Sequence, residues 1–435
     1  MADKFTEETI NRAVLVGLNA NSLSRDDNAS DTTLEELEAL LETAGGTCLG
    51  TVLQNKDTPD ARTFIGEGKV AEVKELVAAQ EADLVIFDNE LSPSQVRVLT
   101  EEIGVQVMDR AALILDIFAQ RAKTREGRLQ VELAQYKYLL PRLTGMWGHL
   151  VRQTAAGGRS PIGTRGPGET QLETDRRHIG RKIAKLTQEL EEVRRIRGVQ
   201  RERRQKNEVP VVAIVGYTNA GKSTLLNALT DAGIPANNRL FDTLDTTTRT
   251  LEISDTCTVL LSDTVGFIRK LPHHLVEAFK ATLEELTFAD LLLHVIDASN
   301  PEWRYQAQVV DNLIRELGAE TTPRIEVFNK ADTCQGDIMP HGENILSISA
   351  KTGQGLDQLL EMIGKRLDTG YYKVVLHLPY DMGGAVDLLY REAKVERVAY
   401  AETIEVTAIC TPRLLGQLQE YIVEGWTPPK EPWED

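Results

Sequence analysis

Short apolar runs bounded by polar or glycine-containing turns recur in the second half of the chain and predict buried strands. They occupy residues 210–215, 258–262, 291–297, 324–328 and 345–348. Helical patterns follow the first and the last of these runs, at 224–229 and 355–367. Strands and helices that alternate in this way form a doubly wound, mostly parallel sheet, so residues 207–368 are predicted to be one α/β domain.

The same alternation occupies residues 1–120. Apolar runs and amphipathic stretches alternate there, with strands predicted at 13–18, 48–53, 83–88 and 105–109 and helices at 32–41, 69–79 and 94–102. This pattern predicts an N-terminal α/β domain with a small, mostly parallel sheet. At the other end, residues 369–435 carry two strand patterns and two short helical ones, and we expect a small C-terminal α/β domain there.

A helical hairpin is predicted for residues 121–206. Apolar residues from Ile114 to Leu140 recur at helical spacing and predict one long amphipathic helix. A second apolar seam, with spacings of 3 and 4, runs from Ile179 to Ile196 and predicts a partner helix. The joining segment 153–170 is rich in glycine and has no apolar pattern, so it is predicted to be the loop of an antiparallel hairpin.

Charge is distributed unevenly along the chain. The net charge is −17, yet residues 121–206 hold 21 Lys and Arg against 9 Asp and Glu, a net +12 that leaves −29 for the rest. A basic element between acidic domains favours a nucleic-acid partner for the hairpin alone. Arg152, Arg159 and Arg165 lie on or beside the glycine-rich loop and are predicted to bind structured RNA. The alternative is a solvated linker.

Composition narrows the class of protein. The chain has 435 residues, is 41% hydrophobic and 26% charged, and its 4 cysteines are scattered without a CxxC pair. No apolar run approaches the length of a membrane span, and the N-terminus has no apolar leader. We therefore expect a cytoplasmic protein of about two to four domains, with free thiols and no integral membrane segment.

The first chemical motif follows the strand at 210–215. It is a phosphate-binding loop, GxxxxGK[ST], in the sequence Gly216-Tyr217-Thr218-Asn219-Ala220-Gly221-Lys222-Ser223, and Thr224 continues into the helix. Its glycines let the backbone N–H groups converge on phosphate oxygens at a helix N-terminus. Lys222 is predicted to reach the β- and γ-phosphates and to act in catalysis, and the Ser223 hydroxyl to bind Mg²⁺.

A second motif, DxxG, follows the next strand in the sequence Asp263-Thr264-Val265-Gly266. Asp263 is predicted to hold Mg²⁺ through water, and the Gly266 amide to sense the γ-phosphate. Between the two motifs, Phe241 opens a segment predicted to contact the nucleotide. Thr243 is our choice for its Mg²⁺ ligand, although Thr246 and Thr247 are close enough to serve. Phe267 follows Gly266 where many GTPases place a water-orienting Gln, so intrinsic hydrolysis is expected to be slow.

The base is read by a third motif, NKxD, in Asn329-Lys330-Ala331-Asp332, supported by Ser349-Ala350-Lys351. A buried carboxylate accepts hydrogen bonds from guanine N1–H and the 2-amino group, which adenine lacks, so the predicted nucleotide is GTP. Asn219 fits GTPases that use K⁺ as an additional ion, and fits equally well a plain turn asparagine.

With these motifs on the chain, the sequence resembles the HflX family of GTPases over nearly its whole length. Besides the phosphate loop, the resemblance rests on Asp109-Arg110, residues 113–122, 129–135, 140–143 and the run Gly166-Pro167-Gly168-Glu169-Thr170-Gln171-Leu172-Glu173. It implies a GTPase that binds the large (50S) ribosomal subunit and its rRNA, splits stalled or idle 70S ribosomes under stress, and is stimulated by the ribosome. It also implies that the hairpin loop reaches toward the peptidyl-transferase centre.

Two other functions remain open from the residues. One is a GTP-timed factor for ribosome assembly or RNA remodelling, and the other is a switch whose partner is a protein. We expect a monomer in each case. Asp242 departs from the family pattern, which has a small residue there, and bears on how the segment around Thr243 acts.

Overall fold

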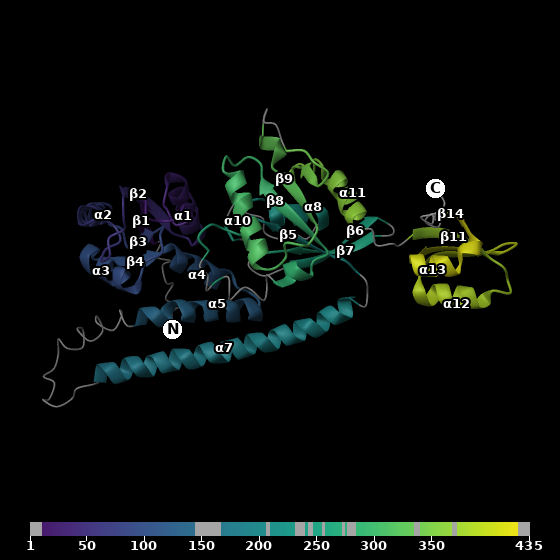
Figure 1. Cartoon of the computed structure of the whole chain (residues 1–435), viewed down its shortest axis with the longest axis horizontal. Helices are drawn as coiled ribbons and strands as arrows, with labels where there is room; N and C mark the ends of the chain where they lie inside the picture. The colour runs from purple at the N-terminus through teal and green to yellow at the C-terminus, as the bar shows by residue number, and fades with distance from the viewer. Residues whose placement is uncertain are drawn as a thin grey trace, which may run out of the picture.

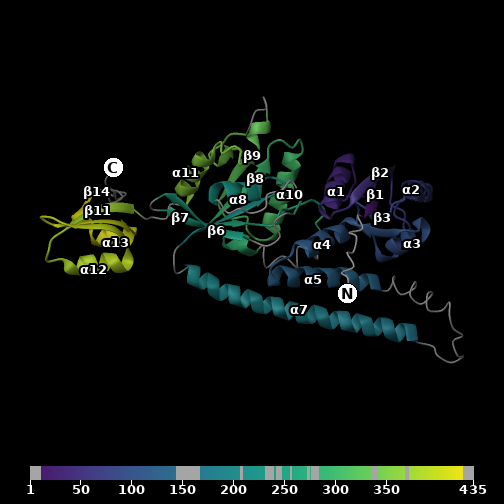
Figure 2. The same cartoon turned by 180° about the vertical axis from the view of Figure 1, so that it is seen from behind.

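The computed structural model describes residues 11–143, 167–205, 209–230, 240–241, 247–254, 257–271, 275, 284–334, 340–367 and 372–424. These residues form three sheets, one in each predicted α/β domain, together with long helices beside the first two (Figures 1 and 2). No helix within these ranges is long and apolar enough to cross a membrane. Arg152, Arg159, Arg165 and Thr243 lie outside the described residues.

The N-terminal sheet is parallel throughout, with strand order β2-β1-β3-β4. Its strands are β1 Arg12–Ala20, β2 Thr47–Lys56, β3 Leu84–Phe87 and β4 Gln106–Asp109, connected by α1 Asp31–Thr43, α2 Glu67–Gln80 and α3 Pro93–Ile103. The six residues Ala13–Leu18 of β1 are all buried, because helices cover both faces of a parallel sheet. Helix α1 begins with a capping box in which Ser30 accepts from the Thr33 amide.

The central sheet has the order β10-β9-β8-β5-β7-β6, and only the β6–β7 pair is antiparallel. Its strands are β5 Val211–Gly216, β6 Thr247–Ser254, β7 Cys257–Asp263, β8 Leu291–Asp297, β9 Arg324–Asn329 and β10 Ile345–Ser347. Among the described residues of this domain, the helices that pack on it are α8 Lys222–Thr230, α10 Trp303–Glu316 and α11 Leu356–Arg366. The doubly wound α/β prediction is confirmed. Strand β6 and helix α10 were not predicted.

The helical region differs from its prediction at two points. The single long helix expected across residues 114–140 is wrong: α4 Arg110–Arg121 ends, and α5 Arg125–Leu139 begins after Thr124, whose side chain accepts from the Gly127 amide at 3.0 Å. The loop predicted at 153–170 is too long, because α7 Pro167–Gln205 already includes residues 167–170.

Helices α5 and α7 do form the expected antiparallel pair. Leu129 and Leu133 of α5 pack with Leu186 and Leu190 of α7, and both views show α7 running alongside α5 (Figures 1 and 2).

The C-terminal domain forms an antiparallel sheet of its own, in the order β12-β13-β11-β14. Its elements are β11 Tyr372–Leu378, α12 Gly383–Glu392, β12 Lys394–Tyr400, β13 Ile404–Cys410, α13 Pro412–Gln417 and β14 Ile422–Glu424. Its hydrophobic cluster contains residues of this domain alone. Strands β12 and β14 were not predicted from the sequence.

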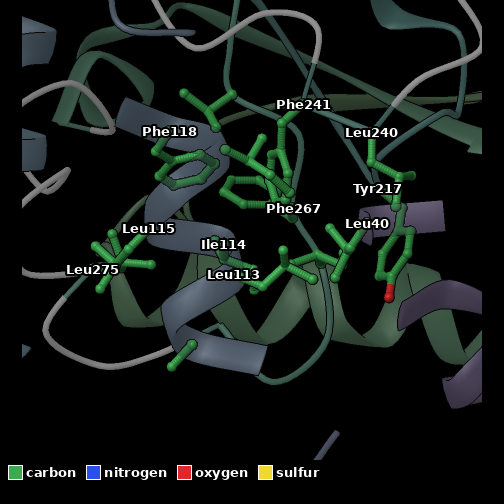
Figure 3. Packing of buried hydrophobic residues seen from close by; sticks show 14 of the residues in the cluster. Leu40, Leu113, Ile114, Leu115, Phe118, Tyr217, Leu240, Phe241, Phe267 and Leu275 are labelled. Carbon is green, nitrogen blue, oxygen red and sulfur yellow. The ribbon is translucent and has the colours of Figure 1, made fainter. Parts of the chain in front are cut away.

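Two hydrophobic clusters cover opposite faces of the central sheet. One cluster, which we call the closed face, packs the sheet against α8 and α11 and stays within residues 212–367. The other, the shared face, begins under α10 and continues into α1 and α4 of the N-terminal region. Figure 3 shows the shared face, where Phe118 of α4 lies beside Phe241 and Phe267. Phe118 and Phe241 meet edge to face, with ring centroids 4.7 Å apart.

Candidate nucleotide site

The loop after β5 has the close backbone packing that the two motif glycines predict. A Cβ at Gly216 would lie 2.2 Å from the carbonyl oxygen of Val295 in β8. Gly221 has φ +94°, and a Cβ there would lie 2.2 Å from Asn329 Nδ2. A side chain at Gly216 would have to displace the Val295 backbone, and one at Gly221 would displace the Asn329 side chain and adopt a strained positive φ. Helix α8 begins directly afterwards at Lys222, so its N-terminal amides face the space that the loop encloses.

The side chain of Lys222 is buried and folded back on the loop. Its Nζ donates to the carbonyl oxygen of Tyr217 at 2.8 Å, and only 6% of the residue is exposed. Burial lowers the pKa of Lys222 to about 8, against the opposing attraction of Asp263. A phosphate placed beside Nζ would supply the missing counter-charge and favour the charged form, as expected for a lysine that binds phosphates.

Ser223 and Asp263 provide the oxygen donors expected for Mg²⁺. The Ser223 hydroxyl donates to Asp263 Oδ2 at 3.0 Å, and Asp263 is fully buried at the end of β7. Over the described residues, no cluster of three or more His, Cys, Asp or Glu could form a metal cage. A hydroxyl and one carboxylate nevertheless fit Mg²⁺, which is bound by few protein oxygens when substrate phosphates supply others.

The DxxG segment is joined to the phosphate loop by the backbone. The Phe267 amide donates to the Gly216 carbonyl at 3.1 Å, and the Thr218 amide donates to the Phe267 carbonyl at 2.7 Å. Thr264 fixes the segment from its other end, because its hydroxyl donates to the Ile214 carbonyl at 2.6 Å. A Cβ at Gly266 would lie 3.0 Å from Lys222 Nζ, so this glycine lies where a γ-phosphate is expected. Phe267 is buried in the shared face.

The base-reading residues converge on the opposite side of the loop. Asn329 Nδ2 donates to the Ala220 carbonyl, and Asn329 Oδ1 accepts from the Ala350 amide, both at 2.9 Å. The Ser349 hydroxyl donates to Asp332 Oδ1 at 2.6 Å. One asparagine thus joins the phosphate loop, the NKxD segment and the Ser349-Ala350-Lys351 segment, where Lys351 is exposed.

Three observations go beyond the predicted site or correct it. Phe241 was predicted to contact the nucleotide, and the structure buries its side chain against Phe118 in the shared face, so the contact that remains a prediction is one made by its backbone. Asp297 was missed, and its Oδ2 accepts from Lys330 Nζ at 2.6 Å. Its position at the end of the buried strand β8 was the available signal. Tyr217, also predicted to bind the nucleotide, directs its side chain away from the loop, and its hydroxyl donates to Glu36 of α1.

Family models match three consecutive parts of the chain. Residues 31–119 match a model described as "GTP-binding GTPase N-terminal", and residues 121–204 match "GTP-binding GTPase Middle Region". Residues 211–330 match "50S ribosome-binding GTPase". The three matches cover the N-terminal sheet except β1, the α5–α7 pair, and the central sheet except β10.

Full-length relatives are similar over most of the chain. "GTPase HflX" of Alkalihalophilus pseudofirmus is 50% identical over 424 residues, covering 96% of this chain and 98% of its own length. The protein of the same name from Caldanaerobacter subterraneus subsp. tengcongensis is 48% identical over 95% of this chain and 94% of its own, and that from Escherichia coli 44% identical over 84% and 86%. A solved GTP-binding protein from Sulfolobus solfataricus, in complex with GDP, is 26% identical with a TM-score of 0.43, over 82% of this chain and 98% of its own.

Proposed function

This chain belongs to the HflX family of GTPases, and from that premise we propose that it hydrolyses GTP on the large ribosomal subunit and separates stalled or idle 70S ribosomes into subunits. The observation that carries the proposal is that one chain joins the full set of guanine-nucleotide motifs to a basic helical hairpin. The family model for residues 211–330 names the 50S ribosome, which supports the choice of partner.

Electrostatics supports rRNA as the surface that the hairpin meets. The net charge of +12 over residues 121–206 stands within a chain of net charge −17, so attraction to phosphate is concentrated on this element. The described part of α7 is 39 residues long, and its N-terminal end adjoins the segment that carries Arg152, Arg159 and Arg165. We propose that these arginines contact rRNA and that the segment enters the space between the subunits.

GTP acts in this proposal by shifting a population of conformations. GTP and Mg²⁺ stabilise one arrangement of the phosphate loop, Gly266 and the segment of Thr243, and that arrangement favours the ribosome-bound form. Hydrolysis removes the γ-phosphate and releases the protein. Stimulation by the ribosome, proposed here because Phe267 cannot orient water, can reach about 10³–10⁵-fold when a partner completes a GTPase site.

The oxygen atoms around the phosphate loop indicate which ions the site would bind. We propose that Mg²⁺ is held by Ser223, Asp263 and Thr243 together with the phosphates. Asn219, whose φ is +61°, is the residue beside which K⁺ could bind as a second ion. A comparison of GTP turnover in K⁺ and in Na⁺ tests this. The ribosomal partner implies a cytoplasmic protein, and we expect a monomer.

The deciding experiment measures GTP turnover with and without purified large subunits, and 70S dissociation by light scattering. The test variant changes Arg152, Arg159 and Arg165 to Ala. The matched control changes three arginines of the other domains, Arg315, Arg366 and Arg391, to Ala. We expect strong stimulation and GTP-dependent dissociation that the test variant loses and the control keeps.

Other outcomes point to different functions. No stimulation by large subunits contradicts the proposal and favours a switch with a protein partner. Binding to immature subunits, with no effect on 70S particles, favours the assembly or remodelling factor.

A further inference from the structure

We propose that Glu36, a carboxylate of the N-terminal domain, is a positioning residue for GTP hydrolysis. It acts through the Tyr217 hydroxyl, which holds the phosphate loop and the segment after Gly266 at a fixed spacing. The residue thus belongs to a different domain from the nucleotide that it influences. The inference concerns intrinsic hydrolysis and does not depend on a ribosomal partner.

Tyr217 is the second residue of the phosphate loop, and its side chain leaves the loop for the N-terminal domain. The residue is 4% exposed, and Figure 3 shows its ring beside Leu40 of α1. Its hydroxyl donates to Glu36 Oε1 at 2.6 Å. The Tyr217 hydroxyl oxygen in turn accepts from the Arg269 backbone amide at 2.9 Å and from Arg269 Nε at 3.3 Å. One hydroxyl therefore connects the loop, the segment after DxxG and helix α1.

Glu36 also balances the charges around this hydroxyl. Its Oε2 pairs with Arg110 and lies 3.2 Å from Arg269 Nε. Asp88 pairs with Arg110 at 2.8 Å and also with Lys270, and Glu302 pairs with Arg269 at 2.8 Å. These six residues make three cations and three carboxylates, and Arg110, Asp88, Arg269 and Lys270 have side chains no more than 9% exposed. Without Glu36 the group would carry a buried excess of positive charge.

The hydroxyl is held in its donating form. Burial and the neighbouring Glu36 carboxylate both raise the pKa of Tyr217 well above its usual value, outweighing the nearby guanidinium groups. The hydrogen bond to Glu36 is charge-assisted and therefore among the stronger ones in a protein. It fixes the direction in which the Tyr217 oxygen presents its lone pairs to Arg269.

The Tyr217 hydroxyl is expected to affect hydrolysis through the position of the Gly266 amide. Backbone hydrogen bonds already join Phe267 to Gly216 and Thr218, and the Tyr217 hydroxyl adds a third attachment at Arg269, three residues after Gly266. The Gly266 amide is the group expected to sense the γ-phosphate, which GDP lacks. A displacement of about 1 Å at such a group can cost about 10²-fold in rate. Removing the contacts of the Tyr217 hydroxyl with Glu36 and Arg269 should therefore slow hydrolysis more than it weakens GDP binding.

The test measures single-turnover GTP hydrolysis without ribosomes, beside the affinities for GTP and GDP. The variants are Tyr217→Phe, which keeps the buried ring, Glu36→Gln, and the pair. The control is Tyr305→Phe, because Tyr305 donates to Asp26 at 2.7 Å across the same two domains without contacting Tyr217 through its hydroxyl. We expect hydrolysis to fall about 10- to 100-fold in both single variants, with GDP affinity within about threefold and the control unchanged.

Non-additivity completes the test. Because both groups act through one hydrogen bond, the double variant should be no slower than the slower single variant. Unchanged hydrolysis in Tyr217→Phe would overturn the proposal. Equal losses of GTP and GDP affinity at an unchanged rate would also overturn it, since they would show a purely structural role. If Glu36→Gln does not fold, Tyr217→Phe alone decides. These measurements contain no ribosomes, so none of their results decides the ribosomal function, which the experiment with large subunits tests separately.

Discussion

The two faces of the central sheet are covered in different ways. The closed face is filled by α8 and α11 of the same domain. The shared face begins under α10 and passes into α1 and α4, so part of its cover comes from the N-terminal region. The GTPase domain is thus self-sufficient on one side and completed by another domain on the other.

The nucleotide site is divided along the same line. Asn329, Asp332 and Ser349, which are expected to read the base, are held by hydrogen bonds within residues 220–350. Tyr217 and the segment after Gly266, which surround the phosphate end, are hydrogen-bonded to Glu36 or packed in the shared face. The residues expected to recognise guanine are therefore held within one domain, whereas those expected to sense phosphate contact a second domain.

The largest effect, on GTP affinity, is expected among the base-reading residues that one domain holds by itself. Asp332→Asn should lower GTP affinity by about 10⁴-fold and shift preference toward xanthine nucleotides, because the amide presents a donor to guanine N1–H. Thermal unfolding should barely change, since Asn keeps the oxygen that accepts from Ser349. Fluorescent GTP and XTP titrations measure the preference, with the exposed α11 residue changed in Asp357→Asn as the control. GTP affinity within tenfold of the parent protein contradicts the site.

A cavity on each face should distinguish the two cores. Phe118→Ala removes one ring of the Phe118–Phe241 pair and should cost about 3–5 kcal/mol, and Leu359→Ala in the closed face about 2–5 kcal/mol. Only the Phe118 variant should loosen the N-terminal sheet as well. Hydrogen exchange of β1 amides measures this difference. Equal exchange in the two variants would show that the domains are not coupled through the shared face.

Acid should weaken the shared face through His294. His294 lies on β8 with Leu292 on the side of α10, where Asp311 is 3.8 Å away and Arg324 is paired with Asp311. Burial lowers the pKa of His294 to about 4, below its ordinary 6.5. Between these values the unfolded chain binds a proton that the folded protein does not, so stability is full above pH 6.5 and falls as the pH is lowered. The total loss is about 3 kcal/mol.

Urea unfolding at pH 7 and pH 5 measures that loss. His294→Leu should remove about 2 kcal/mol of the change between these two values of pH. His341→Gln, at an exposed position, serves as the control and should leave the change intact. An identical pH dependence in His294→Leu and the parent protein contradicts the assignment.

The smallest effect is expected at the exposed rim of the domain interface. Tyr305→Phe removes the hydroxyl that donates to Asp26 and should cost only about 1 kcal/mol, because water replaces an exposed partner. Asp26→Asn added to it should cost little more. Thermal unfolding of the single and double variants measures both values. A loss as large as that in Phe118→Ala would show that the interface depends on its rim rather than on its buried contacts.

The sequence predicted the interior of the sheets better than their edges. Strand β8 was predicted at 291–297, where the structure has it, because a strand buried on both faces is a continuous apolar run. Strands β6 and β12 were missed because both are edge strands, and the exposed side chains of β12 break the apolar run. The break between α4 and α5 was missed because Ala122-Lys123-Thr124 contains no glycine or proline.

The nucleotide motifs could be predicted because their spacing along the chain reflects local backbone geometry. The phosphate loop, Asp263, Asn329 and Ser349 each lie at or just after the end of a strand of one sheet, and the carboxyl ends of parallel strands meet at one edge. The contact of Glu36 with Tyr217 joins residues 181 apart in sequence and belongs to the packing of two domains. The packing of the Phe241 ring was missed for the same reason, because its partner Phe118 lies in a different region.

The length of α7 has a mechanical consequence. At 1.5 Å per residue, its 39 residues span about 58 Å. Its C-terminal end is separated by residues 206–210 from β5, the strand that leads into the phosphate loop, and its other end adjoins the arginine-bearing segment. A rigid rod of this length turned by about 10° at its base carries its tip through about 10 Å. A small rearrangement at the nucleotide that turned the base of α7, against its packing on α5, would therefore move the other end by about the width of a second helix.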